Sequence, residues 1–308
     1  MMISKFLEIL RQKNSKLNII ENAPMSKYTS FKAGGAAACL VEVQSVEELK
    51  EVLQLVAENN IPHMMLGNGS NILFKDSGYE GVVIKLSQES FSEVAFEECG
   101  DKYKVTCGTG ILLSTLARML LEKSLTGFEF ASGIPGSLGG AVFMNAGAYG
   151  GEMKDVVTMV KVVSPDGKEE KVLSAEEMDF SYRHSILEEN GHIAVEVTFE
   201  FAKGDKEEIS ATMKDLMQKR NSKQPVNYPS AGSTFKRPTG YFAGKLIEDA
   251  GLKGTSVGGA EVSTLHSGFV INKGGATATD ILELIALVQN RVYDKFGVML
   301  EPEVRIIG

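Results

Sequence analysis

Two stretches of the chain combine glycine with small polar residues, a pattern suited to holding the phosphate oxygens of a nucleotide. The longer stretch has eight glycines between Gly127 and Gly151, about one residue in three, where roughly 7% is ordinary. Glycine tolerates positive φ and lets backbone N–H groups approach a ligand closely, so clustered glycines commonly cradle phosphate. Pro135 restricts the backbone within the run SGIPGSLGGA, and apolar residues follow. These features favour an ordered, buried loop over a flexible surface loop.

The shorter stretch, LGNGSN at residues 66–71, follows an apolar segment, where a dinucleotide fold places its first phosphate-binding turn. It does not match the GxGxxG fingerprint, because the third glycine counted from Gly67 is replaced by Ile72 and no helical pattern follows directly. A two-glycine turn alone is a weak signal. Two glycine-rich loops in one chain favour a phosphate-bearing cofactor lying between them, and leave the identity of that cofactor open.

Composition argues against several other classes of protein. The chain has 308 residues, a formal net charge of −8 and no run of lysine or arginine, which disfavours sequence-independent binding of nucleic acid or anionic lipid. Its cysteines (Cys39, Cys99 and Cys107) are widely spaced and its histidines form no metal-binding spacing, so we expect neither a disulfide framework nor a metal site. Charges interrupt the apolar N-terminal run, which predicts no signal peptide or membrane span and hence a cytoplasmic protein.

The hydrophobic pattern begins with a small α/β lobe, which we place at residues 1–88. A strand at 37–43 precedes a helix that opens with a capping box at Ser45. Apolar strands at 61–67 and 82–86 follow. Strand, helix and strand with short connections are the outline of an α/β unit.

The rest of the chain predicts two further parts. Residues 89–221 read as a mixed α+β lobe with two hairpins, a helix and the strand HIAVEVTFEF, and they end in an amphipathic linking helix at 205–221. Residues 222–296 form a third part with two helices and the strand SGFVINK. We expect the last segment, 297–308, to return as a strand to the second lobe.

Seven motifs occur in order along nearly the whole chain: YTSFKAGGAA, LGNGSNILF, SGIPGSLGGAVFMNAGAYGGEM, FSYRHS, PSAGSTFKRP, GGAEVSTLHSGFVIN and LEPEVRIIG. Together they resemble the signature set of the UDP-N-acetylenolpyruvoylglucosamine reductase family. The resemblance implies an α+β fold, with a two-lobed FAD-binding domain of the p-cresol methylhydroxylase/vanillyl-alcohol oxidase type and a C-terminal α/β substrate-binding domain. It also implies noncovalent FAD, NADPH as hydride donor, UDP-N-acetylglucosamine enolpyruvate as acceptor, a role in peptidoglycan synthesis, cell shape and division, and a monomer.

The same resemblance assigns the chemistry to three residues. Reduction of an enolpyruvyl ether puts a hydride on the terminal carbon and a proton on the carbon that bears the carboxylate, so an enolate-like charge must be stabilised. Ser233 in AGSTF would donate the proton, Arg183 in SYRHS offers a rigid charged fork to the carboxylate, and Glu303 in EPEV would support the proton network. The alternatives are an ordinary turn serine, a surface ion pair of Arg183, and pairing of Glu303 with Arg305 on one face of a strand.

Ligand-binding positions are also implied by the resemblance. Those for FAD are Gly67, Gly69, Ser70, Asn71, Ser132, Gly133, Ile134, Pro135, Gly136, Gly139, Asn145, Gly147 and Ile193. For the substrate, Lys223 and Arg237 flank the serine motif. The interval from Arg183 to Ser233 holds one strand and one helix, too little for the insertion of the family's longer form, so the chain resembles the shorter form. Tyr149 and Tyr228 are then candidates to replace the substrate-contacting tyrosine of that insertion.

Two other interpretations stay open. The first is another FAD-dependent oxidase of the same fold. Such enzymes often attach flavin through histidine or cysteine, and neither glycine-rich loop contains either residue. The second is a non-catalytic protein that binds flavin or a nucleotide sugar, which would not require Arg183, Ser233 and Glu303 together.

Overall fold

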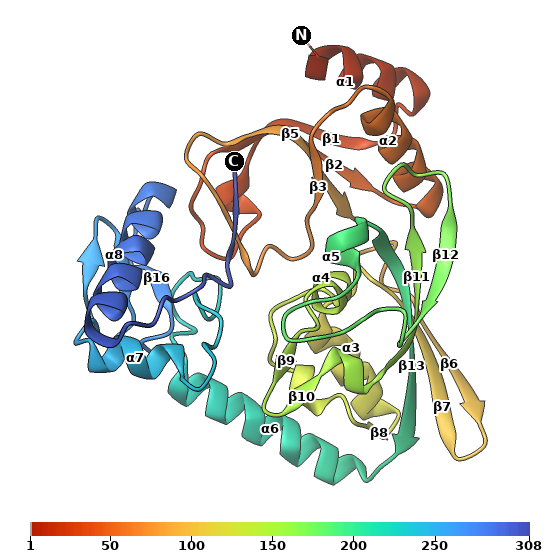
Figure 1. Cartoon of the computed structure of the whole chain (residues 1–308). Helices are drawn as coiled ribbons and strands as arrows, with labels where there is room; N and C mark the ends of the chain where they lie inside the picture. Colours follow the sequence, from red (N-terminus) through yellow and green to blue (C-terminus); the bar gives the residue numbers. More distant parts are fainter. Residues whose placement is uncertain (1) are drawn as a thin grey trace. The chain divides into compact units, whose positions relative to one another are not determined.

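The computed structural model describes residues 2–308, which form two compact units (Figure 1). The first unit contains the chain up to Ile20, Leu40–Asn68 and Gly81–Lys219, and the second contains Glu21–Cys39, Gly69–Glu80 and Arg220–Gly308. The division falls within three strands, β1 (Asn18–Pro24), β2 (Ala36–Val43) and β5 (Tyr79–Leu86). Both units are thus discontinuous in sequence, and the three predicted parts, 1–88, 89–221 and 222–296, stay a prediction.

The N-terminal α/β elements follow the predicted pattern. A four-stranded sheet has the order β1-β2-β5-β3, with β3 (His63–Met65) parallel to β5. The helices here are α1 (Met2–Lys13) and α2 (Val46–Glu58). The Ser45 hydroxyl accepts from the Glu48 amide at 3.1 Å, but the Glu48 carboxylate accepts from the Gln44 amide at 2.7 Å. The capping box is therefore only half formed, because the Glu48 carboxylate accepts from the residue before the N-cap and not from the N-cap itself.

A six-stranded, largely antiparallel sheet forms the larger part of the first unit. Its order is β12-β11-β13-β7-β6, and β8 also pairs with β13. The strands are β6 (Val94–Cys99), β7 (Lys102–Gly108), β8 (Leu125–Thr126), β11 (Val157–Val163), β12 (Glu170–Ser174) and β13 (Ile193–Lys203). Both predicted hairpins, β6–β7 and β11–β12, are confirmed. The rings of Phe128, Phe199 and Phe201 lie 5.4 to 6.0 Å apart in the core with helix α3 (Leu113–Glu122), where aromatic pairs are favourable.

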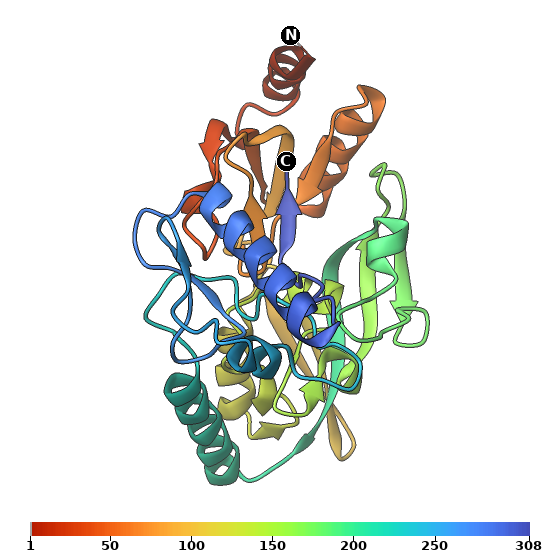
Figure 2. The ribbon, with the colours of Figure 1, turned by 60° about the vertical axis from the view of Figure 1, so that its left-hand side comes forward.

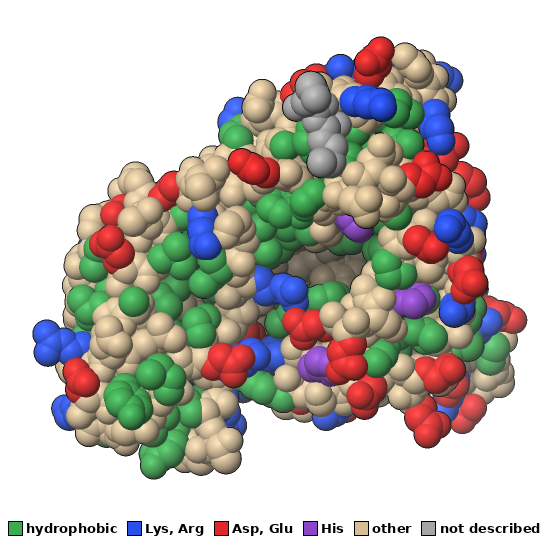
Figure 3. Space-filling model, turned by 45° about the horizontal axis from the view of Figure 1, so that its top comes forward, with side chains coloured by type: hydrophobic (Ala, Val, Ile, Leu, Met, Phe, Trp, Pro, Cys, Tyr) green, Lys and Arg blue, Asp and Glu red, His purple; other side chains and the backbone are tan. Residues whose placement is uncertain are grey.

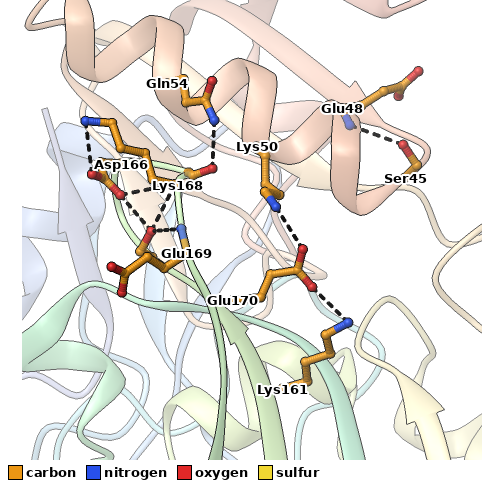
Figure 4. Close-up of polar contacts among 11 residues, drawn as sticks. Ser45, Glu48, Lys50, Gln54, Lys161, Asp166, Lys168, Glu169 and Glu170 are labelled. Carbon is orange, nitrogen blue, oxygen red and sulfur yellow. Dashed lines mark hydrogen bonds and ion pairs between the residues drawn. The ribbon is translucent and has the colours of Figure 1, made fainter.

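The β11–β12 hairpin docks on helix α2 within this unit (Figure 4). Glu170 of β12 bonds to Lys50 of α2 at 2.9 Å and to Lys161 of β11 at 2.8 Å. Gln54 donates to the Gly167 carbonyl at 2.9 Å. Hydrogen bonds from Lys161 first and then Lys50 lower the pKa of Glu170 to about 2. A Cβ on Gly167 would lie 2.5 Å from the Lys50 carbonyl oxygen, so this turn needs glycine.

The linking helix α6 (Lys206–Lys223) runs from the first unit into the second. Its position confirms the predicted helix, but its character differs from the prediction. Among its residues only Ile209 is buried, so α6 is polar nearly all round rather than amphipathic. Its stability must come mainly from its own backbone and side-chain contacts, such as the Lys219–Asp215 pair at 2.7 Å.

The second unit packs the long helix α8 (Ala278–Phe296) against a small antiparallel sheet, as Figures 1 and 2 both show. The sheet has the order β14-β15-β16, and the shorter helix α7 (Ala243–Asp249) also contacts α8. The strands are β14 (Ser256–Val257), β15 (Ala260–Val262) and β16 (Val270–Asn272). At the start of α8, Thr277 and Asp280 form a complete capping box.

The last strand requires a correction. β17 (Arg305–Ile307) pairs in parallel with β4 (Ile72–Phe74), with Ile306 opposite Leu73. It therefore returns to the segment predicted as the first lobe, not to the second as predicted. It is also short, because the chain before it is paired elsewhere: Pro302 lies opposite Phe235, and the Glu303 amide donates to the Thr234 carbonyl. Glu301 and Glu303 consequently lie outside β17, and the expected run of alternating faces does not extend to them.

Asp76 caps helix α8 from a distant part of the sequence, and this gives a first prediction. Its carboxylate accepts from the amides of Ala278 (2.9 Å) and Thr279 (2.7 Å) and from the Thr279 hydroxyl (2.7 Å). Burial by itself would raise the pKa of Asp76, but the hydrogen bonds from Thr279 and Ala278 prevail and hold the pKa below its ordinary value. We expect Asp76→Ala to lower the free energy of unfolding by about 1–2 kcal/mol at neutral pH.

The pH dependence tests the origin of that loss. Because the pKa is lower in the folded state, the contribution is complete above the unfolded pKa and disappears as the pH falls through the folded pKa. Urea unfolding of the wild type and of Asp76→Ala should therefore give different free energies of unfolding at pH 7. This gap should narrow below about pH 4. A gap that stays constant through the acid range would show that lost packing, not the carboxylate, caused the destabilisation.

No helix within residues 2–308 is long and apolar enough to cross a membrane. On the face drawn in Figure 3, acidic and basic side chains are interspersed, in keeping with the absence of a basic run in the sequence. Over the same residues, no group of three or more histidine, cysteine or acidic side chains is placed to hold a metal ion.

Candidate flavin and catalytic site

The two glycine-rich stretches meet within the first unit. The Asn68 side chain donates from Nδ2 to the Pro135 carbonyl at 2.7 Å. A Cβ on Gly67 would lie 2.6 Å from the Ser137 hydroxyl oxygen, closer than real contacts allow. Glycine at position 67 thus reflects close approach of the two loops and not a positive φ, and a larger residue would have to displace the Ser137 hydroxyl. The predicted pairing of these loops is present in the fold.

Backbone amides at this junction fit a phosphate-bearing cofactor. Among the described residues, those whose amides donate to no protein group include Gly67, Asn68, Gly133, Gly136 and Ser137. The first two amides of helix α4 (Leu138–Phe143) are used, since Leu138 donates to Ile111 and Gly139 to Thr109. Unused backbone donors in two adjoining loops are suited to pyrophosphate oxygens. The residues present therefore fit FAD.

Enlarging Gly67 tests this junction. We expect Gly67→Ala to weaken FAD binding about tenfold or more, because the added methyl group overlaps Ser137 and overpacking typically costs about 1–3 kcal/mol. Fluorescence titration of the apoprotein with FAD measures the dissociation constant. Ser137→Ala removes the overlapping oxygen, so the double variant should regain affinity relative to Gly67→Ala. If it does not, the clash is not the cause; Ser137→Ala alone gives the contribution of the hydroxyl.

The remaining flavin candidates of the first unit lie around the same loop. Ser132 is buried and its hydroxyl donates to the Glu129 carbonyl at 2.8 Å. Ile134 is half-buried, and Ile193 is buried at the start of β13. Gly147 lies in β9 (Gly147–Ala148), which pairs with β10 (Gly151–Glu152). Asn145 is fully buried with both amide hydrogens engaged by protein oxygens.

Tyr149 lies at the tip of the β9–β10 hairpin. Both central residues of its turn, Tyr149 and Gly150, have positive φ (+54° and +92°), as a type I′ turn requires. The conformation is unfavourable for tyrosine, and the side chain is 48% exposed. A large aromatic ring is thus presented to solvent near the end of the glycine-rich stretch, which suits the substrate-contacting role predicted for it.

Arg183 lies in a tight turn of the first unit. The turn joins Ser181 and His184, whose backbones exchange both hydrogen bonds at 3.1 and 3.2 Å. Arg183 has φ of +57°, a left-handed conformation that costs a non-glycine residue about 1–2 kcal/mol. Its guanidinium carbon is 5.0 Å from the centre of the Tyr182 ring. Strained backbone at a candidate catalytic residue is an observation from which a functional role is reasonably inferred.

Ser233 and Glu303 belong to neighbouring segments of the second unit. The Glu303 amide donates to the Thr234 carbonyl at 2.8 Å, and Phe235 lies opposite Pro302. Ser233 itself is exposed and follows Gly232, whose φ is +76°, whereas Thr234 is fully buried. The fold therefore brings together two of the three predicted catalytic residues, which are separated by 70 positions in the sequence. Arg183 lies in the other unit.

The end of the first glycine-rich stretch supports Glu303 from within the second unit. Asn71 donates from Nδ2 to the Glu303 carbonyl at 3.1 Å, and its own carbonyl accepts from the Arg305 amide at 3.0 Å. Gly69 has φ of +66°, and a Cβ there would lie 2.0 Å from the Tyr28 carbonyl oxygen. Ser70 lies between them and is half-buried. This structural role of Asn71 was missed, since nothing local signals a contact to residue 303.

His266 supports the serine segment in the second unit. Its Nδ1 accepts from the Gly268 amide at 3.1 Å, and the Gly268 carbonyl accepts from the Thr234 amide at 2.8 Å. Burial lowers the pKa of His266. A neutral imidazole that accepts at Nδ1 is consistent with both observations, so His266 shapes the loop rather than supplying charge to it.

The substrate candidates of the second unit are exposed. Lys223 ends α6, and Tyr228 is 44% exposed. The guanidinium carbon of Arg237 stands 3.9 Å from the centre of the Phe242 ring, and its Nε donates to the Tyr241 carbonyl at 3.3 Å. Phe242 was not predicted as a site residue. Phe242 is 62% exposed and its ring lies against the guanidinium of Arg237, a contact that only the folded chain shows.

Fold and site define the chain as a flavin-binding protein with an additional C-terminal domain. Residues 37–172 match the family model described as an FAD binding domain, and residues 224–307 match the model of the UDP-N-acetylenolpyruvoylglucosamine reductase C-terminal domain. The reductase named UDP-N-acetylenolpyruvoylglucosamine reductase in Clostridioides difficile (strain 630) is 52% identical over 96% of this chain and 95% of its own length. The protein of that name in Caldanaerobacter subterraneus is 50% identical over 100% and 98%.

The chain belongs to the UDP-N-acetylenolpyruvoylglucosamine reductase family. A crystal structure of the Thermus caldophilus reductase matches it with a TM-score of 0.80 and 36% identity, covering 95% of this chain and 99% of that one. A structure of Physcomitrella patens BBE-like 1 covers 64% of the chain with a TM-score of 0.50 at 14% identity, a likeness of fold alone. The predicted family and the α+β fold class, an FAD-binding domain followed by this family's C-terminal domain, are confirmed.

Proposed function

We propose that the protein reduces UDP-N-acetylglucosamine enolpyruvate to UDP-N-acetylmuramate, with NADPH as the hydride donor and noncovalently bound FAD as the carrier. The observation that carries this proposal is about 50% identity, over nearly the whole chain, to proteins named for this reductase. Bound FAD would relay the hydride from NADPH to the terminal carbon of the enolpyruvyl group. The product is a precursor of peptidoglycan. We place the protein in the cytoplasm and expect it to act as a monomer.

The protein's own residues must supply a proton and stabilise charge. Hydride addition leaves negative charge on the carbon beside the carboxylate, where Arg183 would pair with the carboxylate oxygens. Ser233 would give its hydroxyl proton to that carbon. A serine hydroxyl is a weak acid, so it needs neighbours that supply a proton and stabilise the oxygen. Glu303 is supported for that role because its backbone is hydrogen-bonded to the residue after Ser233.

Substrate and cofactor positions follow from exposure and charge. Lys223 and Arg237 are exposed cations that flank the serine segment, and they suit the diphosphate of a nucleotide sugar. Tyr149 and Tyr228 are exposed aromatic residues suited to stacking or hydrogen bonding with the ligand. FAD would contact the two glycine-rich stretches through the unused amides of the first unit.

A direct experiment tests the function. The purified protein should be yellow with the absorption bands of noncovalent flavin, and the enolpyruvyl nucleotide sugar should trigger oxidation of NADPH. A colourless chain that takes up no added FAD would overturn the proposal. An oxidase would be favoured if an alcohol or hydroxy acid reduced the flavin and oxygen reoxidised it, while the enolpyruvyl sugar did not. Bound flavin that supports neither reaction would favour a binding protein.

A further inference from the structure

The turn that carries Arg183 is held from outside by two buried side chains. Within the turn the backbones of Ser181 and His184 exchange a pair of hydrogen bonds, and its arginine adopts a left-handed conformation. Asn145 holds one end and Ser185 the other. Both contacts involve the segment at the end of helix α4, within the longer glycine-rich stretch. All of these residues belong to the first unit.

Asn145 uses its whole amide group in this contact. Nδ2 donates to the Ser181 carbonyl at 2.9 Å and to a Glu152 carboxylate oxygen at 2.8 Å, while Oδ1 accepts from the Lys154 amide at 2.9 Å. The side chain is fully buried and its φ is +41°. Glu152 is held in turn, because its amide donates to Asp155 at 2.8 Å in a capping box. An amide with both hydrogens engaged and no exposure has nothing left to donate to a cofactor.

Ser185 closes the other end of the turn. It is fully buried, and its hydroxyl donates to the Phe143 carbonyl at 2.8 Å. Phe143 is the last residue of α4, and Asn145 lies two positions later. Two hydrogen bonds therefore join residues 181 and 185 to residues 145 and 143. They enclose Arg183, which alone would gain about 1–2 kcal/mol by leaving the left-handed region.

We propose that Asn145 is a positioning residue that holds the Arg183 turn against the glycine-rich loop, with Ser185 as its partner at the other end. This role replaces the flavin contact predicted for the Asn145 side chain. One short segment, 143–145, then fixes both the end of the loop that would hold FAD and the guanidinium that would meet the substrate carboxylate. Only the part concerning catalysis rests on the proposed function.

Hydrogen exchange tests the contact without any turnover. Asn145→Asp keeps the size of the side chain but turns oxygens toward Ser181 and Glu152, which removes both donated bonds and adds repulsion. Exchange of the Ser181 and His184 amides, followed by mass spectrometry on a peptide covering 178–187, should become about tenfold faster or more. A peptide from α3 should not change. Unchanged exchange in 178–187 would overturn the proposal.

Ser185→Ala gives the same test with a smaller perturbation, should the aspartate variant fail to fold. It removes one hydroxyl and leaves Asn145 intact, and it should also speed exchange in 178–187. Gln54→Ala is the matched control, because Gln54 likewise donates an amide hydrogen to a backbone carbonyl in this unit, at 2.9 Å, but contacts the β11–β12 turn. It should leave the exchange of 178–187 unchanged; a change as large as that of Ser185→Ala would overturn the assignment.

A double-mutant cycle tests the effect on catalysis. In stopped-flow measurements, Asn145→Asp should slow flavin reoxidation by the enolpyruvyl substrate about tenfold or more, with flavin reduction by NADPH changed less than about twofold. In an Arg183→Lys background, the same change should slow reoxidation by less than about threefold, because the geometry it disturbs no longer matters. Equal effects in both backgrounds would refute action through Arg183. If the wild type itself fails to react, the proposed function fails, and the exchange experiment still decides the contact.

Discussion

Replacing Ser233 with alanine is expected to slow reoxidation of the reduced flavin by the enolpyruvyl substrate by about three orders of magnitude. Reduction of the flavin by NADPH should stay within about twofold of the wild type, because that half-reaction needs no proton from the protein. The hydride would still be positioned, but the carbon beside the carboxylate would lack its proton donor. Stopped-flow absorbance at the flavin bands separates the two half-reactions.

The surroundings of Ser233 make this variant interpretable. Its side chain is exposed, so removing the hydroxyl leaves no cavity, and the adjacent Thr234 anchors the segment. Thr234 is fully buried; its amide donates to Gly268 at 2.8 Å and its hydroxyl accepts from Val270 at 2.9 Å. Ser256→Ala, an exposed serine of the same unit, is the control and should alter neither half-reaction. Equal slowing of both half-reactions by Ser233→Ala would refute its role as proton donor.

Local elements of the fold were predictable because their signals are local. Apolar spacing placed helix α2, and Leu49, Val52 and Val56 are all fully buried on one face. Alternating residues and turn signals placed both hairpins of the large sheet. Helix α6 shows the limit of such reasoning. Scattered apolar residues suggested an amphipathic helix, yet Ile209 is the one buried residue among those of α6, because spacing alone does not show which face of a helix meets other elements.

Long-range pairings were not predictable, because no pattern in the sequence specifies which strand meets which. β17 pairs with β4 across more than 230 positions, and Asn71 bonds to the Glu303 backbone across 232. Asp76 caps α8 across 202. Each contact joins a residue of ordinary local character to a backbone group, so only the assembled fold identifies the partner. The same holds for Asn145, whose amide donates to the Ser181 carbonyl across 36 positions.

The glycine-rich stretches illustrate both sides of this comparison. Ile72 breaks the dinucleotide fingerprint for a physical reason: it begins strand β4, so the turn leads into a strand and not into a helix whose N-terminus would hold phosphate. The prediction of phosphate binding does not depend on this fingerprint, because it rests on two loops. Their meeting at Asn68 and Pro135, with unused amides on both sides, is the geometric form of that inference.

Replacing Arg183 with glycine is expected to separate stability from activity most clearly. Glycine adopts φ of +57° without steric cost, which relieves about 1–2 kcal/mol, while its extra freedom when unfolded costs about 0.5–1 kcal/mol. The contact of Arg183 with the Tyr182 ring is also lost. These effects nearly cancel, so the free energy of unfolding, measured by thermal unfolding, should change by less than about 1 kcal/mol. The reaction with the enolpyruvyl substrate should nevertheless slow by about 10³-fold or more, because the permanent positive charge at the carboxylate is gone.

Two further variants assign that loss. Arg183→Lys keeps the charge but not the planar fork, and it should slow the substrate half-reaction by about 10²-fold, between the wild type and the glycine variant. Asn60→Gly is the control, because Asn60 is an exposed residue of the first unit with a similar φ of +50°. It should leave both half-reactions unchanged. A glycine variant that unfolds several degrees lower and loses both half-reactions together would mean that Arg183 supports the fold. Loss confined to the substrate step means that the left-handed backbone is retained for the position of the charge.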